Sequence, residues 1–319
     1  MVQLRVKTSS RWVLFPILLI LPLLAACNTN GNSSAAVTEL HNPDTYPGGD
    51  LLINATDLYA RIDDPDLRII DLGEIRSFRE GHIPGAVHVW WQDTIEIHNE
   101  VYGMMADEEA RDQIFSEAGL TSGQDIVAYD DSGGMDAARF LWVLHAVGFD
   151  GNASLLNGGR QAWEAAGYSL STDRYRPSDG GLEQTPNYDV LIGQGEVQSA
   201  IDDPDTMIVD GRSREDQRET WFDRLRHGQI PSSTHFPRDQ TLQDGQVPYF
   251  KSAEELLDML PDDLDPETDQ TVIAYGLHGV KGAHTWFTLK LLGFENVRMY
   301  DGSWADWGAD PDLPIEEVE

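Results

Sequence analysis

The sequence predicts an α/β fold made of two copies of one module, each a parallel β-sheet covered by helices on both faces. The first observation is an internal repeat: the block from Asp125 to Trp163 matches the block from Thr271 to Trp307 in order and spacing. The second is that short β-branched runs alternate with segments of helical periodicity in both copies. The third is length, because about 270 residues remain after the N-terminal segment, which suits two domains.

The first 26 residues are predicted to be an export signal. Positive charges precede an apolar run, Trp12–Leu24, that is shorter than the roughly 20 residues a membrane-spanning helix needs. The run ends in Leu24-Ala25-Ala26-Cys27, which contains the only cysteine of the chain. This ending resembles the bacterial lipoprotein box, which implies cleavage before Cys27 and attachment of lipid to its sulfur. An ordinary secretory signal with a cysteine nearby is the alternative.

Four further segments follow from composition and from the repeat. Residues 27–50 are rich in Asn, Ser, Gly and Pro and lack apolar periodicity, so we expect a flexible tether. Residues 51–175 form the first module, residues 176–190 a linker, and residues 191–319 the second module. We expect the protein to be exported and to lie at the outer face of the cell membrane, anchored by lipid on Cys27.

The charge of the chain restricts its partners. A formal net charge of -33 argues against binding to nucleic acid, because a phosphate-binding protein needs a basic face. A high-salt habitat and an ordinary acidic exported protein both fit this composition.

In the second copy, Val272–Tyr275 is predicted to be a buried strand, Gly276–Lys281 a tight loop, and Gly282–Leu292 a helix. A loop between a strand end and a helix N-terminus turns several backbone N–H groups toward one point and adds the positive end of the helix dipole. The loop is therefore either an anion cradle or only a tight turn.

Both modules resemble rhodanese domains, and the whole chain resembles the tandem thiosulfate or 3-mercaptopyruvate sulfurtransferases. The matching residues cover nearly all of residues 51 to 310. They are Asp71, Gly81–Ala86 and Tyr129–Gly134 in the first copy, and Asp210–Arg212, Ile230-Pro231, Tyr275–Ala283 and Asp301–Trp304 in the second. The resemblance implies a structural first domain and an active loop in the second, with the pattern Cys-x-x-Gly-Val-Thr.

This chain departs from that pattern at the nucleophile. The resemblance implies a cysteine that forms a persulfide, but Gly276 stands at that position and Asp130 stands at the matching position of the first module. We therefore expect no persulfide catalysis, and no catalytic residue is identified. Without a side chain at Gly276 the pocket is expected to be larger, and Gly276→Cys is expected to restore sulfur transfer if the cradle is intact. A functional sulfurtransferase remains the alternative.

The binding half of the site is expected to survive. The anion-binding loop comprises Gly276, Leu277, His278, Gly279, Val280 and Lys281. Arg212, Arg224 and Arg226 are candidates to line the pocket, although ordinary ion pairing is the alternative in a chain with 55 acidic residues. The expected ligand is thiosulfate, sulfate or phosphate, or else the loop binds an unknown protein.

The sequence predicts no metal site at its histidines. His278 has a pKa suited to a nucleophile or a general base, but an exposed loop histidine is the preferred interpretation. The histidines of the second module do not follow a known ligand spacing, so we expect neither a metal nor another cofactor. His82 is expected to hydrogen-bond within a turn between strands.

Overall fold

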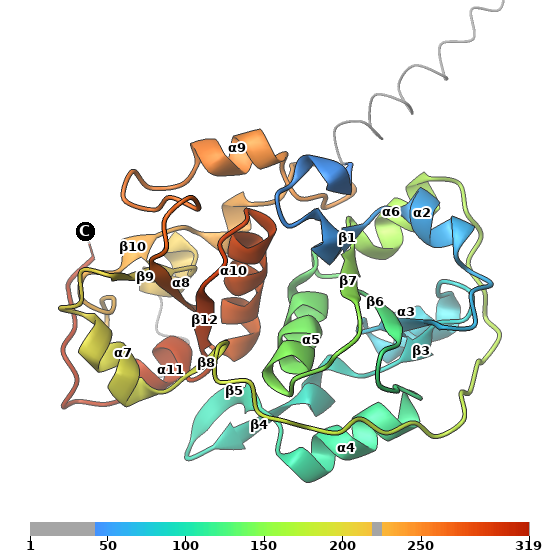
Figure 1. The fold of residues 1–319 in the computed structure, drawn as a ribbon, viewed down its shortest axis with the longest axis horizontal. Coiled ribbons are helices and arrows are strands. Elements are labelled where there is room, and N and C mark those ends of the chain that lie inside the picture. The colour runs from blue at the N-terminus through green and yellow to red at the C-terminus, as the bar shows by residue number, and fades with distance from the viewer. Residues whose placement is uncertain (1–41, 219–224, 319) are drawn as a thin grey trace, which may run out of the picture.

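The computed structural model describes residues 42–218 and 225–318, and it contains two five-stranded parallel sheets of the same topology (Figure 1). In the first sheet the strand order is β1 (Leu52–Ile53), β7 (Ala153–Leu156), β6 (Asp125–Tyr129), β2 (Leu67–Asp71), β3 (Val87–His88). In the second it is β8 (Leu191–Ile192), β12 (Val297–Tyr300), β11 (Thr271–Tyr275), β9 (Thr206–Asp210), β10 (Thr234–His235). The predicted α/β class and the predicted duplication are thus confirmed strand by strand.

The helices repeat in the same order. The first module contains α2 (Ala55–Ala60), α3 (Ile75–Glu80), α4 (Glu108–Glu117), α5 (Met135–Ala146) and α6 (Gly159–Ala165). The second contains α7 (Gln194–Ala200), α8 (Arg214–Arg218), α9 (Ala253–Asp258), α10 (Gly279–Leu291) and α11 (Ser303–Trp307). Single 3-10 turns lie at η1 (Pro43–Thr45), η2 (Gly49–Leu51), η3 (Trp91–Thr94) and η4 (Arg238–Gln240).

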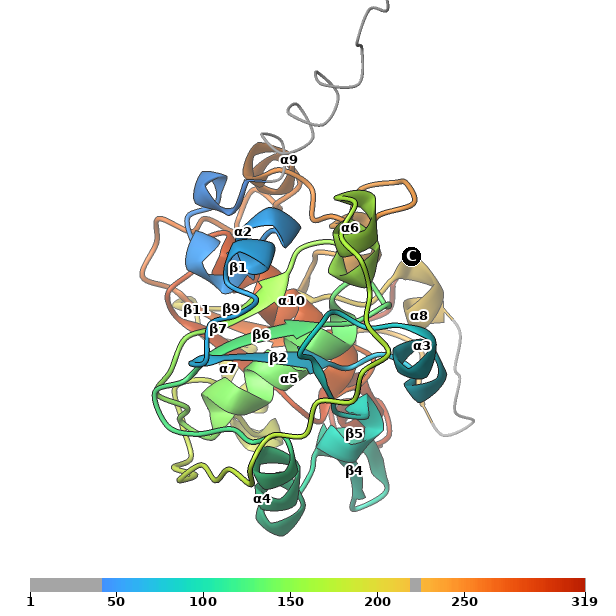
Figure 2. The same ribbon diagram turned by 90° about the vertical axis from the view of Figure 1, so that its right-hand side faces the viewer.

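Helices α5 and α10 pack against each other at the interface between the two modules. They lie side by side between the two sheets (Figures 1 and 2), and the largest hydrophobic cluster runs through both. Their apolar residues, such as Phe140 and Phe287, are fully buried there. The opposite face of each sheet has a smaller core of its own, one around Trp163 and one around Trp307. One continuous core therefore belongs to both modules.

A hairpin inserted in the first module reaches the second. It consists of β4 (Ile95–His98) and β5 (Val101–Met105), which pair antiparallel. The N–H of Met105 donates to Asp301 Oδ2 at 2.7 Å, and Arg139 of α5 donates to Asp301 Oδ1 at 2.6 Å. Arg139 also donates to the carbonyl oxygen of Gly103. A buried ion pair and a strand end thus converge on one carboxylate across the interface.

The expected flexible tether is wrong for residues 42 to 50. This segment forms η1 and most of η2, and Tyr46 is buried against the second module. The Tyr46 hydroxyl donates to the carbonyl oxygen of Lys251 at 2.7 Å, and the N–H of Gly48 donates to that of Leu291 at 2.9 Å. Burial of the Tyr46 ring holds this segment in place, although its Pro- and Gly-rich composition is typical of a loop. The rest of the expected tether, and the expected export signal, lie outside the described residues.

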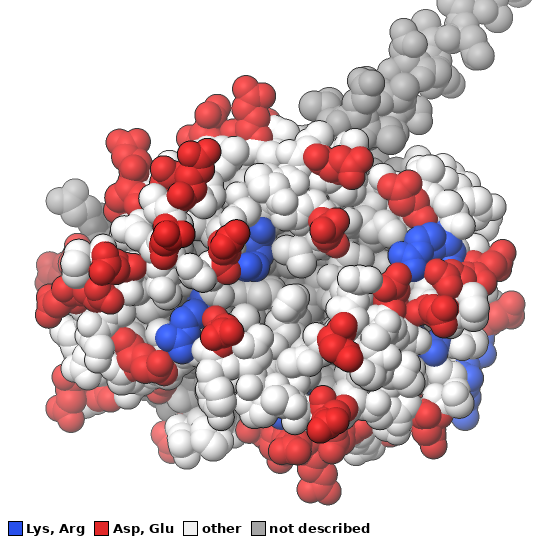
Figure 3. All heavy atoms as spheres, in the orientation of Figure 1, with Lys and Arg blue, Asp and Glu red and all other residues white. Residues whose placement is uncertain are grey.

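The face of the molecule in Figure 3 carries many more acidic than basic side chains. Figure 3 shows Asp and Glu side chains spread across both modules, with few Lys and Arg side chains between them. Within the residues that the structure describes, no helix combines the length and the apolar character that a membrane span requires.

Candidate functional site

The loop of the second module is shorter than the sequence predicts. Helix α10 begins at Gly279 and not at Gly282, so only three residues separate it from β11. The N–H of Gly282 donates to the carbonyl oxygen of His278 at 3.0 Å, which places the expected loop residues in the first helical turn. In the first module five residues, 130 to 134, separate β6 from α5. The aligned segments of the two modules have the same number of residues, but the helix begins earlier in the second module.

The position of the missing nucleophile is closed. A Cβ atom added at Gly276 would lie 2.5 Å from the nitrogen of Gly282 and 2.8 Å from the carbonyl carbon of Lys281. The N–H of Gly276 donates to Ser303 Oγ, and its carbonyl oxygen accepts from the N–H of Trp304. The expectation of a larger pocket is therefore wrong, because the backbone of the advanced helix fills the space.

Lys281 points at a carboxylate of the same module. Its Nζ donates to both oxygens of Asp216, on α8, at 2.7 and 2.9 Å. The Asp216 side chain is only 5% exposed, so this pair is largely shielded from water. Lys281 therefore lies in the first turn of α10 and not in the loop that the sequence predicts, and much of its charge is compensated.

The arginines that the sequence offers serve the fold. Arg212 is fully buried, donates to Asp210 Oδ2 at 2.7 Å, and stacks over the ring of Trp304. Arg226 donates to the carbonyl oxygens of Trp307 and Leu313 and so fixes the end of the chain. Neither guanidinium is free to line a pocket. Arg224 lies outside the described residues.

His278 is not the exposed loop histidine that the sequence favours. Its side chain is partly buried, and its ring meets the edge of Tyr102, from the inserted hairpin, at a centroid distance of 5.6 Å. Burial, together with the positive charges of Lys281 and Arg139, lowers the pKa of His278 to about 3. The ring is therefore neutral at physiological pH. Its Nδ1 is buried without a partner among the described residues.

The structure adds Arg238, which the sequence analysis missed. It begins η4, shortly after the carboxyl end of β10, and its charge contributes to lowering the pKa of both His278 and His284. Its Nε is buried and has no hydrogen-bond partner in the described part of the chain. The rule that ligands sit beyond the carboxyl ends of parallel strands is the signal that would have found it.

The loop of the first module has backbone N–H groups that converge on one side chain, an arrangement that the loop of the second module lacks. The carboxylate of Asp130 accepts the N–H groups of Ser132 and Gly134 on one oxygen and those of Asp136 and Ala137 on the other, at 2.8 to 2.9 Å. Its side chain is buried between β6 and the start of α5. The expectation that Asp130 cannot serve as a sulfur carrier remains, but the residue has a role: it fills the cradle.

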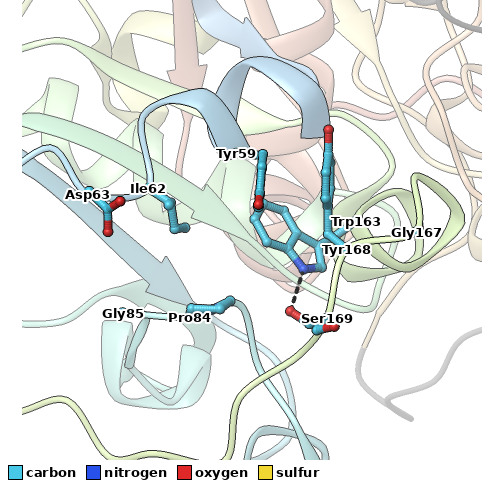
Figure 4. Close-up of a pocket in the computed structure, with 9 residues that line it drawn as sticks. All are labelled: Tyr59, Ile62, Asp63, Pro84, Gly85, Trp163, Gly167, Tyr168 and Ser169. Carbon is cyan, nitrogen blue, oxygen red and sulfur yellow. Dashed lines mark hydrogen bonds between the residues drawn. The ribbon is translucent and has the colours of Figure 1, made fainter.

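Large surface hollows lie elsewhere. A hollow of about 460 Å³ lies in the first module, and the rings of Tyr59 and Tyr168 stack at 4.1 Å beside Trp163. Figure 4 shows the residues that line it. This hollow and three others in the described residues have no lining residue from Gly276–Lys281. The described residues also contain no group of three or more His, Cys, Asp or Glu side chains arranged to hold a metal ion. His82 hydrogen-bonds to the carbonyl oxygens of Phe78, in α3, and of Asp173, 91 residues further along the chain. The sequence predicts a hydrogen bond within a turn between strands, and these partners lie in a helix and in a distant segment.

Comparisons with known proteins agree with the duplicated fold. The rhodanese-like domain model matches residues 54–166 and 193–310. The thiosulfate sulfurtransferase of Corynebacterium glutamicum is 32% identical over 290 residues, which is 86% of this chain and 93% of that protein. That of Pseudomonas aeruginosa is 29% identical over 83% of this chain and 97% of the relative.

A solved structure shows the same fold. The crystal structure of SseA from Escherichia coli, described as a 3-mercaptopyruvate sulfotransferase, superposes with a TM-score of 0.70 and 24% identity. It covers 80% of this chain and 98% of that one. With two matched domains and the same tandem architecture, the chain belongs to the rhodanese family.

Proposed function

We propose that this rhodanese-family protein does not transfer sulfur through a persulfide and instead binds a small oxyanion at the start of α10. The observation that carries the proposal is Gly276, which supplies no sulfur atom and stands where even a Cβ would meet backbone at 2.5 Å. The only cysteine of the chain, Cys27, lies far upstream. Persulfide chemistry needs a thiolate nucleophile, so this loop cannot perform it.

Three features support binding of an oxyanion such as thiosulfate, sulfate or phosphate. The first turn of α10, Gly279–Lys281, has N–H groups without intrahelical acceptors. Arg238 lies close enough to act electrostatically on His278, and its Nε is unpartnered among the described residues. Lys281 adds a second cation, which Asp216 orients. A cation and helix N–H groups together favour a negatively charged ligand.

An activity assay tests the catalytic half of the proposal. Sulfur transfer converts thiosulfate and cyanide to sulfite and thiocyanate, and we expect no thiocyanate above the level of Lys281→Ala. The alternative is a sulfurtransferase with thiosulfate or 3-mercaptopyruvate as donor, supported by the names of the sequence relatives. Turnover well above the Lys281→Ala variant with either donor would establish that alternative.

Titration calorimetry tests the binding half. We expect heat on addition of thiosulfate, sulfate or phosphate, and weaker binding by Arg238→Gln and Lys281→Ala. Lys290→Ala is the matched control, because Lys290 carries the same charge at the opposite end of α10. Equal losses in all three variants would show general attraction by positive charge. The absence of heat would leave a protein partner as the ligand of this surface.

We also propose that the protein is exported and anchored by lipid on Cys27. The lipoprotein-like ending Leu24-Ala25-Ala26-Cys27 supports this, and no part of it is among the described residues. The chain from Cys27 to residue 42 spans at most about 50 Å when extended, so the body would stay near the membrane surface. Intact mass of the mature protein should show a new N-terminus at Cys27 with added acyl chains. A membrane-bound fraction that persists in Cys27→Ser would contradict the anchor.

A further inference from the structure

The loop of the first module, residues 130 to 137, has the form of an occupied anion site. Four backbone N–H groups converge on the two oxygens of Asp130, two on each, at 2.8 to 2.9 Å. Two of these groups, from Asp136 and Ala137, belong to the first turn of α5, a helix of 12 residues. The positive end of that helix thus adds to the four donors.

The backbone is shaped for this contact. Gly133 and Gly134 have φ values of +75° and +84°, a left-handed conformation that favours glycine. These two residues turn the chain so that the N–H groups on either side of them point inward. The equivalent stretch of the second module is helical from Gly279, and there the N–H of Gly282 is used inside the helix. Only the first module keeps the convergent donors.

Asp130, whose carboxylate accepts these four N–H groups, occupies the position in the first module that Gly276 occupies in the second. Asp130 follows Tyr129 as Gly276 follows Tyr275, and its side chain is 1% exposed. A buried carboxylate is costly unless hydrogen bonds compensate it, and here four charge-assisted bonds do so. No Lys or Arg side chain pairs with Asp130 among the described residues. The compensation therefore comes from the backbone.

We propose that residues 130 to 137 form an anion site whose ligand is built into the chain as the Asp130 carboxylate. When that carboxylate is removed, the site accepts a small free carboxylate of the same size. The site does not depend on the oxyanion site proposed at α10, which lies in the other module and uses other residues. In the native protein the built-in ligand keeps thiosulfate and similar anions out of the first module and holds the start of α5 in place.

Chemical rescue of Asp130→Ala in the full chain tests the proposal, because formate matches the carboxylate that the substitution removes. The variant should unfold at a lower temperature than the native protein. Formate, compared with chloride at equal ionic strength, should restore about half or more of the lost midpoint at a concentration well above its dissociation constant. Sulfate and thiosulfate, which are larger than the removed group, should restore less.

Asp107→Ala is the matched control. Asp107 caps α4 by accepting the N–H of Ala110, so its loss removes an aspartate from a helix start without leaving a four-donor cradle. Formate should rescue neither this variant nor the native protein. Equal stabilisation of all three proteins by formate, or none in Asp130→Ala, would overturn the proposal.

A second variant decides the matter if Asp130→Ala does not fold. Asp130→Cys, combined with Cys27→Ser, carries a single thiol inside the cradle. Convergent N–H groups and a helix N-terminus should lower the pKa of this thiol below about 7, against an ordinary value near 8.5. The pH dependence of alkylation by iodoacetamide reports that pKa. An ordinary or raised value would show that the loop does not favour an anion.

Discussion

Asp136 is a second buried carboxyl group beside Asp130, and its pKa is raised. Its side chain is 6% exposed, Oδ2 accepts a hydrogen bond from Ser132 Oγ at 2.6 Å, and Oδ1 has no partner among the described residues. Burial, followed by the negative charge of Asp130, raises the pKa of Asp136 to about 7. Asp130 holds four N–H donors, so Asp136 is the member of the pair that keeps a proton.

The raised pKa predicts how stability depends on pH. The folded protein binds this proton more tightly than the unfolded chain, so the contribution of Asp136 is present below about pH 4 and is lost as the pH rises to about 7. Asp136→Asn removes this dependence. Relative to the native protein, the variant should gain up to a few kcal/mol of unfolding free energy between pH 5 and pH 8, measured by urea denaturation. Asp107→Asn, at an exposed cap, should show no such gain, and parallel curves for Asp136→Asn would contradict the assignment.

Arg139 and Asp301 form the ion pair that crosses the domain interface. Both side chains are buried, and Asp301 also accepts the N–H of Met105. Removal of one partner leaves an uncompensated charge, so Arg139→Met should cost about 3–5 kcal/mol in unfolding free energy. Arg76→Met, which breaks an exposed pair with Glu80, should cost less than about 0.5 kcal/mol. Arg139→Met combined with Asp301→Asn should cost less than the sum of the two single changes, and strict additivity would show that the groups are not coupled.

Helix α10 differs from its repeat partner α5 at the start and not along its length. Both follow a strand that ends in tyrosine, yet α10 starts two residues earlier in the repeat alignment. In the first module Gly133 and Gly134 take positive φ values and hold the loop open. In the second module Gly279 begins the helix instead. The two elements therefore present their N–H groups differently although their sequences repeat one pattern.

The early start of α10 predicts that Gly276→Cys does not restore sulfur transfer. The new Cβ would displace the backbone of Lys281 and Gly282, which should cost about 1–3 kcal/mol, and the thiol would lack convergent donors. Denaturation and the thiocyanate assay measure the two effects. Gly181→Cys, where an added Cβ meets nothing within 4 Å, should cost little. Measurable turnover by Gly276→Cys would show that the loop can reopen.

The sequence predicts the repeated topology well and the loops less well, for a physical reason. Strands and the Gly81–Ala86 type of segment repeat because each module buries the same apolar positions, and those patterns are local. The closure at Gly276 depends on the residue at which α10 begins, which helical periodicity does not fix. The half-buried ring of His278 and the proximity of Arg238 depend on contacts between residues far apart in the chain. The inserted hairpin that contacts His278 has no counterpart among the described residues of the second module, so the repeat did not predict it.

The whole molecule carries far more negative than positive charge. With 55 acidic residues against 22 Lys and Arg, like charges face one another across the surface, as Figure 3 shows for one face. Such self-repulsion destabilises the compact state, and salt screens it. The two modules share a continuous core, so this repulsion acts on one cooperative body.

Salt should therefore stabilise the protein at neutral pH. An increase in NaCl from about 0.05 M to about 1 M should raise the midpoint of thermal unfolding at pH 7 by screening these repulsions. At the isoelectric point, near pH 4.3, the net charge vanishes and the effect should be much smaller. A rise of the same size at both pH values would mean that salt acts through hydrophobic burial and not through charge.

The contacts of residues 42 to 51 determine when this segment can fold during synthesis of the chain. Tyr46 bonds to a carbonyl oxygen 205 residues further along, and Gly48 bonds to Leu291, close to the end of α10. At about 5–20 residues per second, a ribosome needs roughly 10–40 s to make the chain between Tyr46 and its acceptor. The first described residues of the chain are thus among the last to reach their native place. This segment can make its hydrogen bonds to the second module only after Leu291 has been synthesised.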